Sequence, residues 1–382
     1  MVNRCLLLTL MIEFAAGFAG AAPQGGIVYV GTYADGGSRG IYRFRFDDAT
    51  GRLYSDGLAA ETGSPSFLAS DAGGRFVFAV NENDSLALNS GGVTAFEAEP
   101  KSGGLRFINQ QPSGGSSPCH LTLDRTGRFL LVANYGGSVS VLPVAKDGRL
   151  SPPVVHTGPK GRGPHPRQDR SHPHGVYLDR TNTRLLVPDL GLDRILAYSF
   201  DPARGSLKLA DSLSAALAPQ AGPRHLAWSS DGRHVYSVNE LDSTVTTFAW
   251  DPKNGRLSRR GSVSTLPDDS QGENYTAEIA LHPSGRFLYA SNRGDDSIVV
   301  LAVDPSTGAL TRTAVVPVGG RKPRHFVIAP SGRWMLVAHQ TSGTIAVLSL
   351  NPETGRPQPA GDLVNIASPV SLLFLPAPAS GR

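Results

Sequence analysis

Cysteine is scarce in this sequence, and the shortage limits how the fold can be stabilised. The 382 residues contain two cysteines, Cys5 and Cys119. Cys5 lies in an apolar N-terminal stretch that we expect to be removed, so one thiol would remain and no disulfide could form within the mature chain. We therefore expect the packed core, rather than covalent cross-links, to supply the stability.

A strong net charge and long apolar runs are also missing. Lys and Arg number 36 against 32 Asp and Glu, which leaves a formal net charge of +4. This balance predicts no basic face for nucleic acid. Beyond the N-terminus no apolar run is long enough to span a membrane. No glycine-rich loop follows a strand and opens a helix, so the sequence carries no nucleotide-binding motif.

Aromatic residues make up only 7% of the chain, whereas glycine and proline number 44 and 29. This balance favours short strands joined by tight turns and argues against a helical bundle. A chain of this length is long for one simple domain, but it is ordinary for a single β-propeller. The composition therefore points to an all-β fold.

The N-terminus has the pattern of a secretory signal peptide. Arg4 supplies a positive charge, residues 5–12 are apolar apart from polar interruptions, and Ala19-Gly20-Ala21 gives a small-residue cleavage pattern. We expect residues 1–21 to be a signal peptide and residues 22–382 to form one domain without a linker. The mature protein would then be periplasmic or secreted, and would not be attached to a membrane.

One unit recurs along the rest of the chain. A polar turn ending in Gly-Arg is followed by an apolar run and a polar pair in segments 69–83, 123–137, 229–241, 282–294 and 329–341, with a weaker copy at 178–191. An apolar stretch precedes each turn, usually opened by a proline: Pro65, Pro118, Pro173, Pro223 and Pro323, with Thr276 in the sixth unit. The period of about 46–55 residues, with four β-runs per unit, is typical of propeller blades.

The repeat also indicates how the ring closes. Residues 26–33 match only the second half of the unit, and residues 368–376 supply a spare first strand opened by Pro369. We therefore predict a seven-bladed β-propeller in which 368–376 complete the blade begun by 26–56.

Equivalent positions of the repeat should meet on one face of this ring, because the first strand lines the channel and the second runs back outward. Directly after the proline position come Ser66, Cys119, His174, Arg224, Ala277, Arg324 and Val370. One residue further on are Phe67, His120, Gly175, His225, Glu278, His325 and Ser371. The second strands end at Tyr33, Glu82, Tyr135, Leu190, Glu240, Arg293 and Gln340. Clustered His, Arg and Glu favour an acid/base site that binds an anion; the alternative is a water-filled channel that tolerates polar residues.

Several motifs occur together and in order: HPHG at 172–175, GPRH at 222–225, VNE at 238–240, GRFLYASNRG at 285–294 and PRHF at 323–326. In combination they resemble the lactonase family of seven-bladed β-propellers, which includes propeller-type 6-phosphogluconolactonases and carboxy-muconate cyclases. The resemblance covers nearly the whole mature chain. It implies functional roles for His174, Arg224, Glu240 and Arg293, and Arg167 matches an Arg-Gln element that precedes the histidine.

The residue types suggest a division of roles. Arg224 and Arg293 carry permanent charge that can hold an anion and polarise an ester carbonyl, unless they only form structural ion pairs. His174 titrates near neutrality and can take a proton from water, with Glu240 orienting it or activating the water. The expected substrate-binding residues are Arg167, His225, Glu278, Arg324 and His325, although the histidines could equally be satisfied channel polar groups.

Four histidines lie along one segment, at positions 156, 165, 172 and 174. Their spacing is not that of a compact ligand set and no obvious set of carboxylate partners accompanies them, so we expect no metal ion and no other cofactor. His172 lies in the connecting loop outside the repeat positions, and we expect it to matter less than His174.

These patterns lead to one function and two alternatives. The leading hypothesis is hydrolysis of a small sugar-derived or carboxylated lactone, similar to 6-phosphogluconolactonase. An exported protein would not meet a phosphorylated sugar, which belongs to the cytoplasm. The first alternative is a cycloisomerase that forms a lactone from an unsaturated acid, and the second is a non-catalytic propeller that binds a protein or glycan. The sequence leaves the oligomeric state open.

Overall fold

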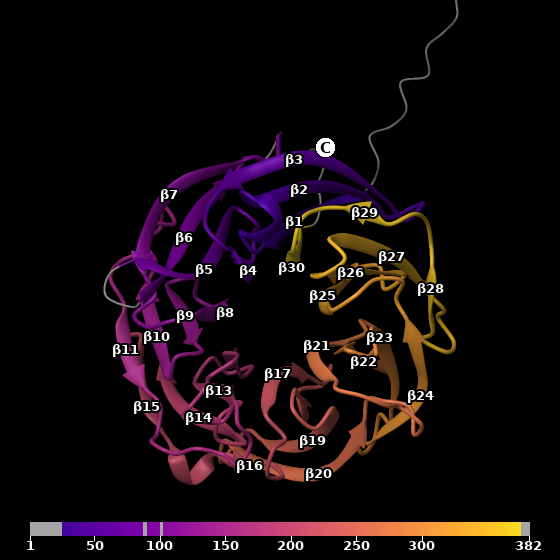
Figure 1. Cartoon of the computed structure of the whole chain (residues 1–382). Coiled ribbons are helices and arrows are strands. Elements are labelled where there is room, and N and C mark those ends of the chain that lie inside the picture. The colour runs from indigo at the N-terminus through magenta and orange to yellow at the C-terminus, as the bar shows by residue number, and fades with distance from the viewer. Residues whose placement is uncertain (1–24, 87–89, 100–101, 376–382) are drawn as a thin grey trace, which may run out of the picture.

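The computed structural model describes residues 25–86, 90–99 and 102–375, and within them seven antiparallel sheets are arranged radially around a common centre (Figure 1). The expected signal peptide lies outside the described residues. No helix in the described ranges is both long and apolar enough to cross a membrane. The prediction of a seven-bladed, all-β propeller is confirmed.

Each blade runs from an inner strand at the centre to an outer strand at the rim. The first three blades, named from the inside outward, are β30 (Pro369–Leu375), β1 (Gly25–Thr32), β2 (Gly40–Asp47) and β3 (Arg52–Glu61); β4 (Leu68–Ser70), β5 (Phe76–Leu86), β6 (Ser90–Ala98) and β7 (Leu105–Pro112); and β8 (Pro118–Leu123), β9 (Phe129–Asn134), β10 (Ser138–Pro143) and β11 (Val154–Thr157). The short 3₁₀ helix η1 (Asp35–Gly37) follows β1.

The remaining four blades follow the same order. They are β12 (Tyr177–Leu178), β13 (Arg184–Asp189), β14 (Arg194–Asp201) and β15 (Ser206–Leu209), with β16 (Ala215–Ala216) on β14; β17 (Pro223–Trp228), β18 (His234–Asn239), β19 (Thr244–Asp251) and β20 (Arg256–Ser264); β21 (Tyr275–Leu281), β22 (Phe287–Arg293), β23 (Ser297–Val303) and β24 (Leu310–Pro317); and β25 (Pro323–Ile328), β26 (Trp334–His339), β27 (Thr344–Leu350) and β28 (Pro357–Pro359), with β29 (Val364–Asn365) on β27. A second 3₁₀ helix, η2 (Asp211–Leu213), precedes β16.

The ring closes as the repeat predicted. Strand β30 pairs antiparallel with β1, with Val30 opposite Leu372 and Val28 opposite Phe374. The last strand of the chain thereby becomes the innermost strand of the first blade and completes its four-stranded sheet.

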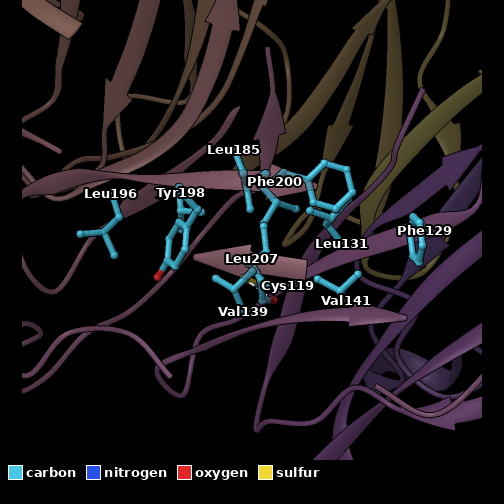
Figure 2. Packing of buried hydrophobic residues seen from close by; sticks show 13 residues of the cluster. Cys119, Phe129, Leu131, Val139, Val141, Leu185, Leu196, Tyr198, Phe200 and Leu207 are labelled. Carbon is cyan, nitrogen blue, oxygen red and sulfur yellow. Dashed lines mark hydrogen bonds between the residues drawn. The ribbon is translucent and has the colours of Figure 1, made fainter. Parts of the chain in front are cut away.

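The core is divided among the seven contacts between neighbouring blades, and each contact has its own cluster of buried apolar side chains. Figure 2 shows the cluster between the third and fourth blades, where Leu131 and Val141 meet Leu185 and Phe200. Middle strands such as β9 are buried along their whole length because both of their faces are covered by neighbouring blades.

Glycine and arginine in the repeated turns join one blade to the next. Gly205 has a φ of +69°, and a Cβ there would lie 2.2 Å from the ring of Phe129 in the preceding blade. Arg333 at the end of the Gly-Arg turn pairs with Asp48 of the first blade at 2.6 Å. Gly205 belongs to the turn between β14 and β15, whereas the Arg333 contact agrees with an architectural role for the arginine of the repeated Gly-Arg turn.

Candidate active site

A carboxylate surrounded by three arginines forms the centre of the site. Glu240 follows β18, and its Oε2 lies 3.0 Å from Nε of Arg224 and 3.0 Å from Nη2 of Arg293. Its Oε1 lies 2.6 Å from Nη1 of Arg167. Three of the residues implied by the family resemblance, together with Arg167, therefore meet around one group.

A β-bulge positions Arg224 and Arg324, each of which directly follows a strand-opening proline. In β17, Pro223 pairs with Asn239 and His225 with Val238, so Arg224 has no partner opposite it. The same shift occurs in β25 around Arg324. A bulged residue is turned out of the regular alternation, and here both guanidinium groups face the same end of the ring as Glu240.

Two members of this charge cluster, Arg224 and Glu240, are buried, whereas the side chain of Arg167 is 39% exposed. Arg224 and Glu240 are 3% and 2% exposed. Burial alone would raise the pKa of Glu240, but Arg293, Arg224 and Arg167 together lower it to about 2. Burial lowers the pKa of Arg293 to about 10, against the opposing effect of Glu240. The cluster therefore carries one negative and three positive charges at neutral pH.

Arg324 stands apart from this cluster. Its Nη2 donates a 2.7 Å hydrogen bond to the hydroxyl of Tyr33, and its guanidinium lies over the Tyr33 ring. The Tyr33 hydroxyl in turn donates to Glu82 at 3.0 Å. Among the residues that the structure describes, no carboxylate lies within ion-pairing distance of Arg324. This half-buried cation is thus available to an anionic ligand.

His174 enters the site from the loop before β12. Its backbone N–H donates to Pro188 at 2.9 Å, and its ring lies 5.4 Å from that of His225 and 5.6 Å from that of Tyr135. Nδ1 is buried and has no hydrogen-bond partner within the described ranges. Burial and the charge of Arg224 hold the pKa of His174 well below its usual value, so the imidazole is neutral.

The geometry does not join Glu240 to His174 as expected. Both oxygens of Glu240 face guanidinium groups, and no hydrogen bond connects it to His174 in the described part of the chain. Three cations outcompete a neutral imidazole for one carboxylate. Glu240 is therefore arranged to hold the arginines rather than to assist the histidine.

Three residues expected to bind substrate lie one layer deeper. His225, Glu278 and His325 are buried around the ring of Phe67, whose centroid is 5.9 Å from that of His225 and 5.5 Å from that of His325. In the fourth blade, Tyr177 of the short strand β12 occupies this deeper layer, and its ring lies against that of His120. Gly175 leaves room for the Tyr177 ring because it has no side chain. The structure thus separates an upper layer of arginines from a lower layer of histidines.

Sequence reasoning missed the support for the Arg167 loop. His172, expected to matter less, stacks on Tyr135 at 4.2 Å, and its ring nitrogens bond to the carbonyl of Tyr135 and to Asp169. Gln168 donates to Asp193 at 2.7 Å and to the carbonyl of Leu190. The only signal in the sequence was Tyr135 itself, which stood among the strand-end positions of the repeat.

Asp193 connects this loop to the strand that carries Arg224. Besides the Gln168 side chain, it accepts hydrogen bonds from the backbone N–H groups of Gln220 and Gly222 at 2.7 and 2.8 Å. The loop of Arg167 and the start of β17 are therefore fixed to one carboxylate, which sets the two arginines relative to each other.

Other features of the structure lie away from this site. Within the described residues no group of three or more His, Cys, Asp or Glu side chains is arranged to hold a metal ion. A cavity of about 870 Å³ is lined by Asp231, His234, Tyr236 and Arg286 among others, at the turns of the fifth to seventh blades. It shares no residue with the arginine cluster.

Comparisons with known proteins agree with the motifs. The family model described as "Lactonase, 7-bladed beta-propeller" matches residues 27–374. The 6-phosphogluconolactonase of Bacillus subtilis (strain 168) is 36% identical over 302 residues, which cover 79% of this chain and 84% of that protein. The 6-phosphogluconolactonase of Formosa agariphila is 32% identical over 310 residues, covering 79% and 86%.

A solved structure resembles the whole ring. The periplasmic gluconolactonase of Pseudomonas aeruginosa superposes with a TM-score of 0.87 and 37% identity, covering 93% of this chain and 100% of that one. The expected enzyme class is thereby confirmed at the level of the family. With a matching model over nearly all the described residues, the chain belongs to the lactonase family of seven-bladed β-propellers.

Proposed function

We propose that the protein hydrolyses a small anionic lactone derived from a sugar, at the cluster of Arg224, Arg293, Arg324 and His174. The observation that carries the proposal is the excess of positive charge around Glu240: one carboxylate faces three guanidinium groups. Arg324 adds a fourth cation, whose close side-chain partner among the described residues is Tyr33. Such a group of charges favours an anionic substrate and an anionic transition state.

The proposed chemistry needs one base and one set of cations. Neutral His174 takes a proton from water as the water oxygen bonds to the lactone carbonyl carbon. The carbonyl oxygen becomes an oxyanion, which Arg224 and Arg293 stabilise. When the bond between that carbon and the ring oxygen breaks, the ring oxygen takes the proton from His174, and the product is a hydroxy acid.

Arg324 and Arg167 are proposed to bind the substrate's own anionic group. Arg324 has the geometry for this, since Tyr33 holds its guanidinium at one nitrogen and over one face. Arg167 is 39% exposed while it contacts Glu240, so it can also meet a ligand. The planar, multiply donating guanidinium suits a carboxylate or a phosphate equally.

We propose a periplasmic or secreted location, for which the N-terminal pattern gives the reason. The relatives differ in their names on this point: two are 6-phosphogluconolactonases, and the neighbouring structure is a periplasmic gluconolactonase. Export favours a sugar lactone whose anionic group is a carboxylate rather than a phosphate, because phosphorylated sugars are intracellular.

A panel of lactones tests the proposal. Plain, carboxylated and phosphorylated aldonolactones are incubated with the protein at pH 7, and acid release is measured against the spontaneous rate. We expect hydrolysis that Arg224→Ala and Arg293→Ala each reduce by about 10²–10³-fold. The absence of hydrolysis for every lactone, with ring closure of an unsaturated acid instead, would identify a cycloisomerase. Binding of glycans without turnover would identify a binding propeller.

A further inference from the structure

We propose that Glu278 is a positioning residue which, through His225 and with His325, holds the guanidinium of Arg224 in its working orientation. This inference rests on the proposed function, because it assigns Arg224 to the reaction. It assigns to these three residues a role other than the substrate contact that we expected from the sequence.

Both histidines converge on one oxygen of Glu278. Nδ1 of His225 lies 2.9 Å and Nε2 of His325 lies 3.3 Å from Oε2 of Glu278. The other oxygen, Oε1, accepts the backbone N–H of Ile279 at 3.0 Å. The two oxygens of the Glu278 carboxylate contact groups from the fifth, sixth and seventh blades. Glu278 therefore connects these three blades at this level of the ring.

The hydrogen bonds determine where the protons lie. The backbone N–H of Leu372 donates to Nδ1 of His325 at 3.2 Å, so this nitrogen is an acceptor and the proton of the neutral ring is on Nε2. Nε2, which carries the proton, lies 3.3 Å from Oε2 of Glu278. His225 can complete the arrangement by donating from Nδ1 to the same oxygen. The orientation of the His225 ring is thus a consequence of the position of Glu278.

The ring of His225 in turn supports Arg224. Nη1 of Arg224 lies 3.4 Å from both ring nitrogens of His225, so the guanidinium faces the imidazole as a whole rather than one nitrogen. The same Nη1 donates to the carbonyl of Ala277 at 2.7 Å, and Ala277 directly precedes Glu278. Arg224 is therefore held from below by this pair and from above by Glu240.

His225, Glu278 and His325 are buried in the lower layer, which separates positioning from substrate contact. Glu278 is 8% exposed, and the ring of Phe67 lies against His120 at 4.2 Å in the centre of the layer. Burial raises the pKa of Glu278, while His325, Arg224 and Arg324 oppose the shift. The neighbouring His120 is also buried and Tyr177 is partly buried; burial lowers the pKa of His120 and raises that of Tyr177.

Glu278→Gln tests the network with little change of shape. The amide has one oxygen and one NH₂ group, so it cannot accept both histidine protons on one side and the Ile279 N–H on the other. We expect kcat for the lactone to fall at least about 10-fold, with KM within about 3-fold, because the missing stabilisation acts on the transition state. The control is Ser371→Ala, which alters the same layer where Ser371 accepts the N–H of Leu68. It should keep kcat within about 2-fold.

A double-mutant cycle separates positioning from an independent contribution. If Glu278 acts through Arg224, Glu278→Gln should cost little further rate in an Arg224→Lys background. Multiplicative losses would overturn the proposal, as would a rise in KM alone or equal losses from Glu278→Gln and Ser371→Ala.

Nitrogen chemical shifts of the histidine rings provide a readout that needs no turnover. We expect His325 to be the Nε2–H tautomer in the unaltered protein, and the signals of His225 to shift in Glu278→Gln. A His325 proton on Nδ1 would overturn the network itself. If no lactone is hydrolysed but these signals behave as expected, the proposed function fails while the network stands.

Discussion

Arg324 and Tyr33 form a hydrogen bond across the closure of the ring, although 291 positions separate them in the chain. Arg324 belongs to the inner strand of the last blade, and Tyr33 follows β1 in the first blade. The pairing of β30 with β1 brings the two together. The correct closure of the propeller is thus also a condition for this part of the candidate site.

Removal of the Tyr33 hydroxyl should weaken substrate binding. In Tyr33→Phe, Arg324 loses its 2.7 Å hydrogen bond and becomes less well oriented. Because a hydrogen bond to a charged group contributes about 1.5–3 kcal/mol, we expect KM for an anionic lactone to rise about 10-fold. Steady-state kinetics with a charged and an uncharged lactone measure this effect. Equal changes for both substrates would contradict the role of Arg324 as an anion-binding residue.

Neutralisation of Glu240 should destabilise the fold as well as the site. Glu240→Gln leaves Arg167, Arg224 and Arg293 facing each other without a counter-charge. Removing one partner of a buried ion pair typically costs about 3–5 kcal/mol, and we expect a loss of this order in urea unfolding. Glu61→Gln, which removes an exposed ion pair on β3, is the control and should change stability by less than about 1 kcal/mol.

The pH dependence of hydrolysis should follow His174. Burial lowers the pKa of His174 below 6.5, so the base form dominates at neutral pH and is lost only as the pH falls. We expect kcat/KM to be flat around pH 7 and to decline only well below pH 6.5. His174→Asn should lose most of the activity, and any residual rate should lack this acidic limb. A limb unchanged in His174→Asn would assign the base to another residue.

Chelation should leave hydrolysis unchanged. The proposed mechanism uses arginine side chains for the charge that a metal ion would otherwise neutralise. Incubation with EDTA followed by the lactone assay measures this. Loss of activity that one divalent ion restores would show that a metal site was overlooked, with residues 156–174 the first segment to examine.

The mature N-terminus should lie near Ala22. Mass spectrometry of the protein expressed in its native host and separated by cell fraction determines the first residue. We expect the shortened chain in the periplasmic or secreted fraction. Recovery of intact residues 1–21 in the cytoplasm would instead make a phosphorylated sugar lactone the first substrate to test.

The architecture of this protein could be predicted from its sequence because one sequence unit recurs along the chain. The Gly-Arg turns and strand-opening prolines recur with one period, and local hydrophobic patterns are sufficient to define strands. Residues 368–376 could be assigned to the first blade because the repeat left one strand missing there and one spare. The same register placed His174, Arg224, Glu240 and Arg293 on one face.

Only the tertiary structure determined how deeply each side chain of the candidate site lies, which groups it contacts and which charges surround it. The β-bulge at Arg224 and the short strand at Tyr177 depend on backbone geometry in neighbouring blades. The position of a residue within the repeat does not encode that geometry. Two adjacent positions therefore became separate layers: Arg224 faces Glu240 above, and His225 faces Glu278 below. Whether a carboxylate assists a histidine or holds three arginines depends on distances of a few ångströms between residues far apart in the chain, because electrostatic and hydrogen-bond energies change steeply over that range.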